Sequence, residues 1–72
     1  MSSLKILDRT GHSTVEWTPE IEESVAAARS RFDSQREAGY VAYRVRGGQS
    51  EAIKDFDEAA EEIIMSPVLA GG

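Results

Sequence analysis

The sequence predicts a small α+β domain in which one amphipathic helix packs across a four- or five-stranded mixed sheet. Three observations favour this class: two β-favouring runs flank a glycine near the amino terminus, a patterned helical segment follows, and further strand candidates complete the 72 residues. A chain of this length supports one small hydrophobic core. We therefore expect a single domain over residues 1–70, followed by a flexible diglycine tail at residues 71–72.

The first two strands are expected at residues 4–8 and 13–17. The first run is rich in Leu and Ile, and the second alternates polar with apolar or β-favouring side chains. Between them, Gly11 can adopt the positive φ angle that a tight turn demands. These features predict a β-hairpin, at whose end Trp17 seals the entry to the helix.

The helix is expected at roughly residues 19–38. Thr18 can cap it, Pro19 suits the first helical position, and acidic residues in the first turn complement the positive end of the helix dipole. Gly39 can end it. Apolar residues recur at spacings of four, three and four and predict the buried stripe: Ile21, Val25, Ala28 and Phe32.

The second half of the chain predicts a third strand, a glycine turn, a weaker fourth strand, a helical turn and a last strand. In that order they are expected at residues 40–46, 47–48, 51–56, 57–61 and 63–69. Pro67 marks an edge or a strand end. The order is therefore ββα followed by two or three strands. Its simplest packing places the first and last strands parallel at the centre, which is the β-grasp arrangement.

The third strand carries residues that we interpret as a surface for a protein partner. Alternation separates Val41, Tyr43 and Val45 from a second set, Tyr40, Arg44 and Arg46. We expect the second set to lie on the open face of the sheet. With one further lysine it would form a cationic and aromatic binding surface of four residues: Tyr40, Arg44, Arg46 and Lys54. The alternative is that these are ordinary exposed side chains of a strand, with no role in binding.

Composition narrows the classes of partner. A net charge of −5 argues against nucleic acid and favours partners with basic grooves, although acidic blocks at residues 20–23 and 55–62 also suit a solvated surface. The chain has no cysteine, and its acidic residues lack the spacing of a calcium loop, so we expect no metal site and no cofactor. No apolar stretch approaches membrane-spanning length. We expect a cytoplasmic monomer without a membrane partner.

Intrinsic enzyme activity is not expected. The only histidine, His12, falls in the predicted hairpin turn. There, a solvated side chain is a simpler interpretation than a catalytic base. The stretch Arg46-Gly47-Gly48-Gln49 lacks the Lys-Ser/Thr of a phosphate-binding loop and predicts a plain turn. Any step that uses ATP must therefore be carried out by another protein.

The chain resembles the ubiquitin-like superfamily in the order of its elements and in short stretches of sequence. Its opening hairpin, which turns at Thr10-Gly11, is similar to that of ubiquitin, and a proline with acidic residues opens the helix in both. The closing stretch, residues 64–72, contains Pro67-Val68 and ends on glycines, like the sulfur carriers of molybdopterin and thiamine synthesis. The helix is longer than that of ubiquitin, and Ala70 replaces the arginine before the ubiquitin diglycine.

This resemblance implies that the chemistry falls on Gly71 and Gly72. An ATP-dependent activating enzyme would adenylate the Gly72 carboxylate. The acyl group would then pass to sulfide as a thiocarboxylate, serving a sulfur-accepting enzyme, or to an enzyme cysteine as a thioester on the way to a lysine of a protein target. Both outcomes stay open. The alternative is a small non-covalent adaptor or assembly subunit that binds a protein partner through its sheet face.

Overall fold

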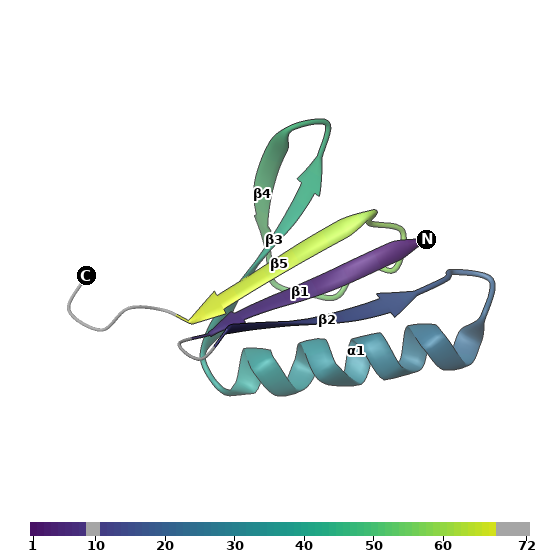
Figure 1. Cartoon of the computed structure of the whole chain (residues 1–72), viewed down its shortest axis with the longest axis horizontal. Helices are drawn as coiled ribbons and strands as arrows, with labels where there is room; N and C mark the ends of the chain where they lie inside the picture. The colour runs from purple at the N-terminus through teal and green to yellow at the C-terminus, as the bar shows by residue number, and fades with distance from the viewer. Residues whose placement is uncertain (9–10, 68–72) are drawn as a thin grey trace.

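The computed structural model shows one helix packed on one face of a five-stranded mixed sheet (Figure 1). The structure describes residues 1–8 and 11–67. In chain order the elements are β1 (Ser2–Asp8), β2 (Gly11–Trp17), α1 (Glu22–Glu37), β3 (Tyr40–Arg46), β4 (Gln49–Ile53) and β5 (Glu62–Pro67). The predicted α+β class, with a single helix across a mixed sheet, is confirmed.

The sheet is centred on a parallel pair formed by the first and last strands. Its strand order is β2-β1-β5-β3-β4, and every neighbouring pair except β1 and β5 is antiparallel. In the parallel pair, Leu4 lies opposite Ile63 and Ile6 opposite Met65. All four side chains are at most 1% exposed. The centre of the sheet is therefore also the centre of the hydrophobic core.

Three aromatic rings complete the core between the helix and residues 54–61, the segment that joins β4 to β5. The Phe56 ring centroid lies 5.0 Å from that of Trp17 and 5.6 Å from that of Phe32. Trp17 is 1% exposed, and its Nε1 donates a hydrogen bond of 3.0 Å to the Glu58 carbonyl. Segment 54–61 thus covers part of the inner face, and Trp17 contacts its Phe56 ring and its Glu58 carbonyl.

The helix begins three residues later than predicted. Ile21 is its extended N-cap, Thr18 supplies no cap, and the chain turns before the helix with the Ile21 N–H bonded to the Thr18 carbonyl. Ser24 Oγ accepts from the Thr18 N–H and so holds this turn. Because Ile21 lies before the first helical turn, it is 55% exposed, and its place in the predicted stripe is wrong. The remaining three stripe residues are buried: Val25, Ala28 and Phe32.

Glycine turns fall where the sequence predicted them. Gly39 follows the C-cap with φ of 95°, and Gly47 and Gly48 form the two-residue β3–β4 turn with φ of 54° and 80°. The predicted strand at residues 51–56 is shifted, since β4 ends at Ile53. Residues 57–61 contain one hydrogen-bonded turn, closed by the Ala60 N–H and the Asp57 carbonyl, instead of a helical turn. Of the predicted last strand, residues 68–69 lie outside the described residues.

We expect Phe32→Ala to lower the free energy of unfolding by about 3–5 kcal/mol, because it empties the helix side of the core next to Phe56. Ile21→Ala is the matched control on the same segment and should change stability by no more than about 0.5 kcal/mol. Urea denaturation followed by Trp17 fluorescence measures both. Equal stabilities for the two variants would contradict the packing described above.

Candidate functional site

The structure reverses the two faces that the sequence assigned to β3. Ala42 is 1% exposed in the core, and Tyr40 packs against the core as well. Alternation then places Arg44 and Arg46 on the side of the sheet that carries the helix, and not on the open face. The prediction that the arginines lie on the open face is wrong. A small alanine fits beneath the helix, and the sequence pattern of β3 alone does not distinguish its two sides.

Arg44 ties the β3–β4 hairpin to segment 54–61. Its Nη1 donates to Asp57 Oδ2 at 2.6 Å, and its Nη2 donates to Glu51 Oε1 at 2.7 Å. The side chains of Arg44 and Asp57 are 25% and 26% exposed. The hydrogen bond from Arg44 holds the pKa of Asp57 below its ordinary 3.8, and the Ala59 N–H lowers it further. The hydrogen bond to Asp57 and the negative charge of Glu51 raise the pKa of Arg44. Arg44 is therefore already occupied by contacts within the domain.

Of the other three residues of the predicted binding surface, Arg46 lies near Arg44, and the two arginines line one pocket with Gln49, Ser50 and Glu51, whereas Tyr40 and Lys54 lie elsewhere. Tyr40 packs against the core, and its carbonyl accepts a hydrogen bond of 2.8 Å from Arg36 Nη1. Arg46 flanks the Gly47–Gly48 turn, whereas Lys54 follows β4 at the opposite end of the hairpin. Both are exposed. Their participation in partner binding stays a prediction, but they form no continuous patch with Tyr40.

The open face of the sheet carries an apolar patch that the sequence reasoning missed. Strand alternation and the register bring five apolar residues together on this face, which we call the open-face patch: Leu7, Val41, Tyr43, Val45 and Ile64. Leu7 and Tyr43 are 42% and 37% exposed. The alternation of β1, whose Leu4 and Ile6 are buried, was the signal that could have placed Leu7 here.

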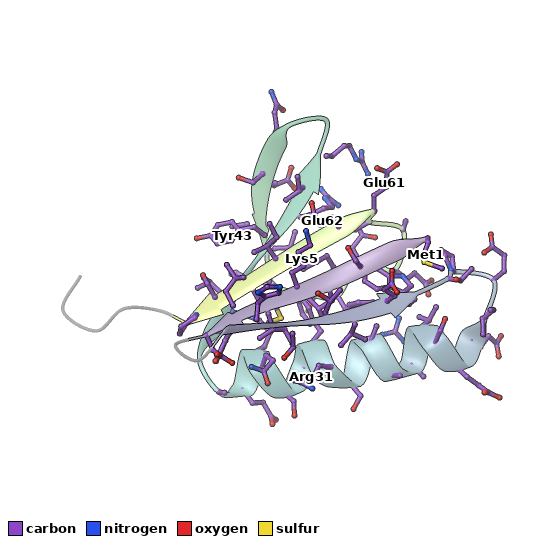
Figure 2. The ribbon with its side chains drawn as sticks, in the orientation of Figure 1. Met1, Lys5, Arg31, Tyr43, Glu61 and Glu62 are labelled. Carbon is purple, nitrogen blue, oxygen red and sulfur yellow. The ribbon has the colours of Figure 1, made fainter. Side chains whose placement is uncertain are left out.

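The open face is poor in charge compared with the rest of this acidic domain. Lys5 Nζ and Glu62 Oε2 lie 2.9 Å apart and form an ion pair across β1 and β5. Figure 2 shows this pair on the sheet, with Tyr43 on the neighbouring hairpin and Arg31 on the distant helix. Among the described strand residues on this face, alternation adds one further charged side chain, Glu16. The open face thus has an apolar centre, and the charges of the side chains around it nearly cancel.

Neither a metal-binding cluster nor a membrane-spanning helix is present among the described residues. Residues 1–8 and 11–67 contain no group of three or more His, Cys, Asp or Glu side chains placed to hold a metal ion. His12 is exposed on β2. No helix in these ranges has both the length and the apolar character needed to cross a membrane.

The predicted activation residues, Gly71 and Gly72, lie outside the described residues. The last described residue is Pro67, which ends β5 opposite Tyr40 at the start of β3. Comparison with protein-family models, curated proteins and solved structures found no match for this chain. Its interpretation therefore depends on its own residues and geometry.

We expect Asp57→Asn to destabilise the domain near neutral pH, where the Asp57 carboxylate binds Arg44. Because the folded-state pKa of Asp57 is lowered, its contribution is complete above the ordinary 3.8 and disappears as the pH falls below that value. The difference in unfolding free energy between the two proteins should shrink accordingly. Denaturant titrations across this pH range measure it, with Asp55→Asn as a charge-matched control. A difference that does not change with pH would show that the Arg44–Asp57 contact contributes nothing.

Proposed function

We propose that this chain is a β-grasp protein of the ubiquitin-like kind that is activated at the Gly72 carboxylate. The supporting observation is the parallel pairing of β1 with β5 at the centre of a sheet ordered β2-β1-β5-β3-β4, with one helix across it. That arrangement is the one that the resemblance to ubiquitin-like carriers and modifiers implies. Fold alone does not establish function, so the proposal also depends on the diglycine in the sequence.

The position of β5 suits such a role. β5 is the central strand of the sheet, and residues 68–72 follow its last described residue, Pro67, in the sequence. Two of these residues are glycines, which offer no side chain to obstruct a narrow enzyme channel. The activating enzyme would then bind the folded domain while it acts on the carboxylate.

The proposed chemistry begins with a poor acyl donor. A Gly72 carboxylate oxygen attacks the α-phosphorus of ATP in the activating enzyme, and pyrophosphate leaves. Sulfide or an enzyme cysteine then attacks the acyl carbon, and AMP leaves as the C–S bond forms. In a modifier, a lysine amine of the target displaces the thiol and forms the amide. The choice between sulfur transfer and conjugation belongs to the partner enzymes.

Deleting Gly71 and Gly72 should abolish ATP–pyrophosphate exchange by the activating enzyme from the native cell. The melting curve should not change, because the described core is complete at Met65. Phe32→Ala provides the contrast, since it should lower the melting temperature while leaving the tail chemistry available below it. Full cellular function of the truncated protein would contradict the proposal.

A second candidate function is non-covalent binding of a protein through the open-face patch. The centre of a protein interface is typically rich in apolar and aromatic residues and poor in charged ones. The patch meets that description, with Leu7 and Tyr43 partly exposed and Lys5 neutralised by Glu62. In this function the domain is an adaptor or assembly subunit, and the diglycine is not used.

Replacing Leu7 and Tyr43 together by Ser should weaken binding of the protein that copurifies from the native cell by at least about tenfold. Ile21→Ser is the control, because Ile21 is another exposed apolar residue that lies away from the open face. Quantitative mass spectrometry of copurified material compares the variants. Equal recovery of the partner by all of them would rule out the open-face patch as its binding surface.

A further inference from the structure

Strand β4 is an edge strand whose outer side pairs with no other strand among the described residues. It pairs only with β3, at the end of the sheet order. Figure 1 shows the β3–β4 hairpin projecting away from α1. The β4 residues from Gln49 to Ala52 are all exposed. The helix therefore gives this edge no cover.

The hairpin register determines which backbone groups of β4 face outward. Arg46 and Gln49 flank the two-residue turn and therefore form a hydrogen-bonded pair of the antiparallel ladder. Two residues further along each strand, Arg44 and Glu51 form the next hydrogen-bonded pair. The intervening residues, Ser50 and Ala52, direct their N–H and C=O groups to the free edge. They offer the hydrogen-bonding groups that an added strand requires.

The side chains of β4 also favour an added strand. Ala52 lies opposite Tyr43, and Ser50 lies opposite Val45, so small residues separate the free edge from the apolar side chains of β3. A large apolar side chain on an added strand could reach Tyr43 across Ala52. Edge strands that avoid pairing commonly carry Pro, Lys or several charges, whereas the five residues of β4 contain neither Pro nor Lys and one charged side chain, Glu51.

Charge indicates the chemistry of the segment that fits here. On the helix side of the hairpin, the Glu51 side chain is 68% exposed and engages Arg44 through one oxygen. A basic residue on an added strand would lie directly across from it. Glu51 lies between the free edge and Arg44, so it is nearer to an added strand than Arg44 is, while Arg46 lies beside the turn and Lys54 follows β4. The net charge of the chain, −5, also favours approach of a basic segment.

We propose that β4 binds an extended segment of a second protein as a sixth strand of the sheet. In that segment, β-branched or aromatic residues cover Ala52 and Ser50 on the open face, and Lys or Arg alternates with them on the side of Glu51. This binding mode uses neither Gly71 nor Gly72. It is independent of the proposed activation chemistry.

The probe is a fluorescently labelled peptide of about eight residues in which Val alternates with Lys, compared with a peptide in which Val alternates with Glu. Fluorescence anisotropy with the full chain should show binding of the lysine peptide that is at least about tenfold tighter. Amide resonances of Ser50 and Ala52 should shift on binding. Preference for the glutamate peptide, or no binding of either, would overturn the proposal.

Two proline variants locate the binding edge. Ala52→Pro removes an outward N–H while leaving the ladder to β3 intact, and it should reduce peptide binding at least about tenfold. Thr14→Pro makes the equivalent change on the other edge strand, β2, and should not affect binding. Loss of binding with Thr14→Pro alone would assign the site to β2 and overturn the proposal.

Three further measurements separate the alternatives. A lysine peptide methylated at its inward-facing backbone nitrogens should bind at least about tenfold more weakly, which tests strand pairing without altering the protein. Sedimentation of the free protein should show a monomer; a dimer that dissociates in Ala52→Pro would show that a second copy occupies the edge and would overturn the proposal. The variant without Gly71 and Gly72 should bind the peptide normally, so that failure of one proposal is distinguishable from failure of the other.

Discussion

The parallel pairing of β1 and β5 is the constraint on which the rest of the structure depends. Parallel neighbours cannot be joined by a tight turn, so the intervening chain must cross one face of the sheet. Helix α1 makes this crossing and buries its short stripe against the strands, where Leu4 and Ile63 face each other at the centre of the core. Because β2 and β3 flank the pair, its backbone is protected on both sides. Because the domain is small, the free energy of unfolding depends on the few core contacts around this pair of strands.

Segment 54–61 completes what the helix leaves uncovered and so determines which surfaces are available for binding. Phe56 reaches the aromatic core, Glu58 binds the Trp17 indole, and Asp57 binds Arg44. These contacts occupy the side of the hairpin that carries the arginines. Two surfaces that these contacts leave exposed are the open-face patch and the outer edge of β4. Both are adjacent to Tyr43, so a strand added at β4 would extend the same apolar face.

Local signals in the sequence predicted the parts of the fold that local physics determines. Glycine positions located the helix end and the β3–β4 turn, and helical periodicity identified Val25, Ala28 and Phe32. The misassignments arose where tertiary contacts decide. Ile21 matches the helical period but lies before the helix, because Ser24 holds the preceding turn. The strand alternation was right, yet the side of β3 that faces the helix depends on packing around Ala42, and the role of segment 54–61 depends on residues distant in sequence.

The central functional claim is that Gly72 carries the reactive carboxylate. Intact-mass spectrometry of the protein isolated from its native cell tests this most directly, because it reports both the end of the chain and any acyl chemistry on it. We expect a chain that ends at Gly72, with a fraction of it either bearing sulfur in place of one carboxylate oxygen or joined to a second protein. A population that continues past Gly72, or that ends there and is never modified, would contradict this claim.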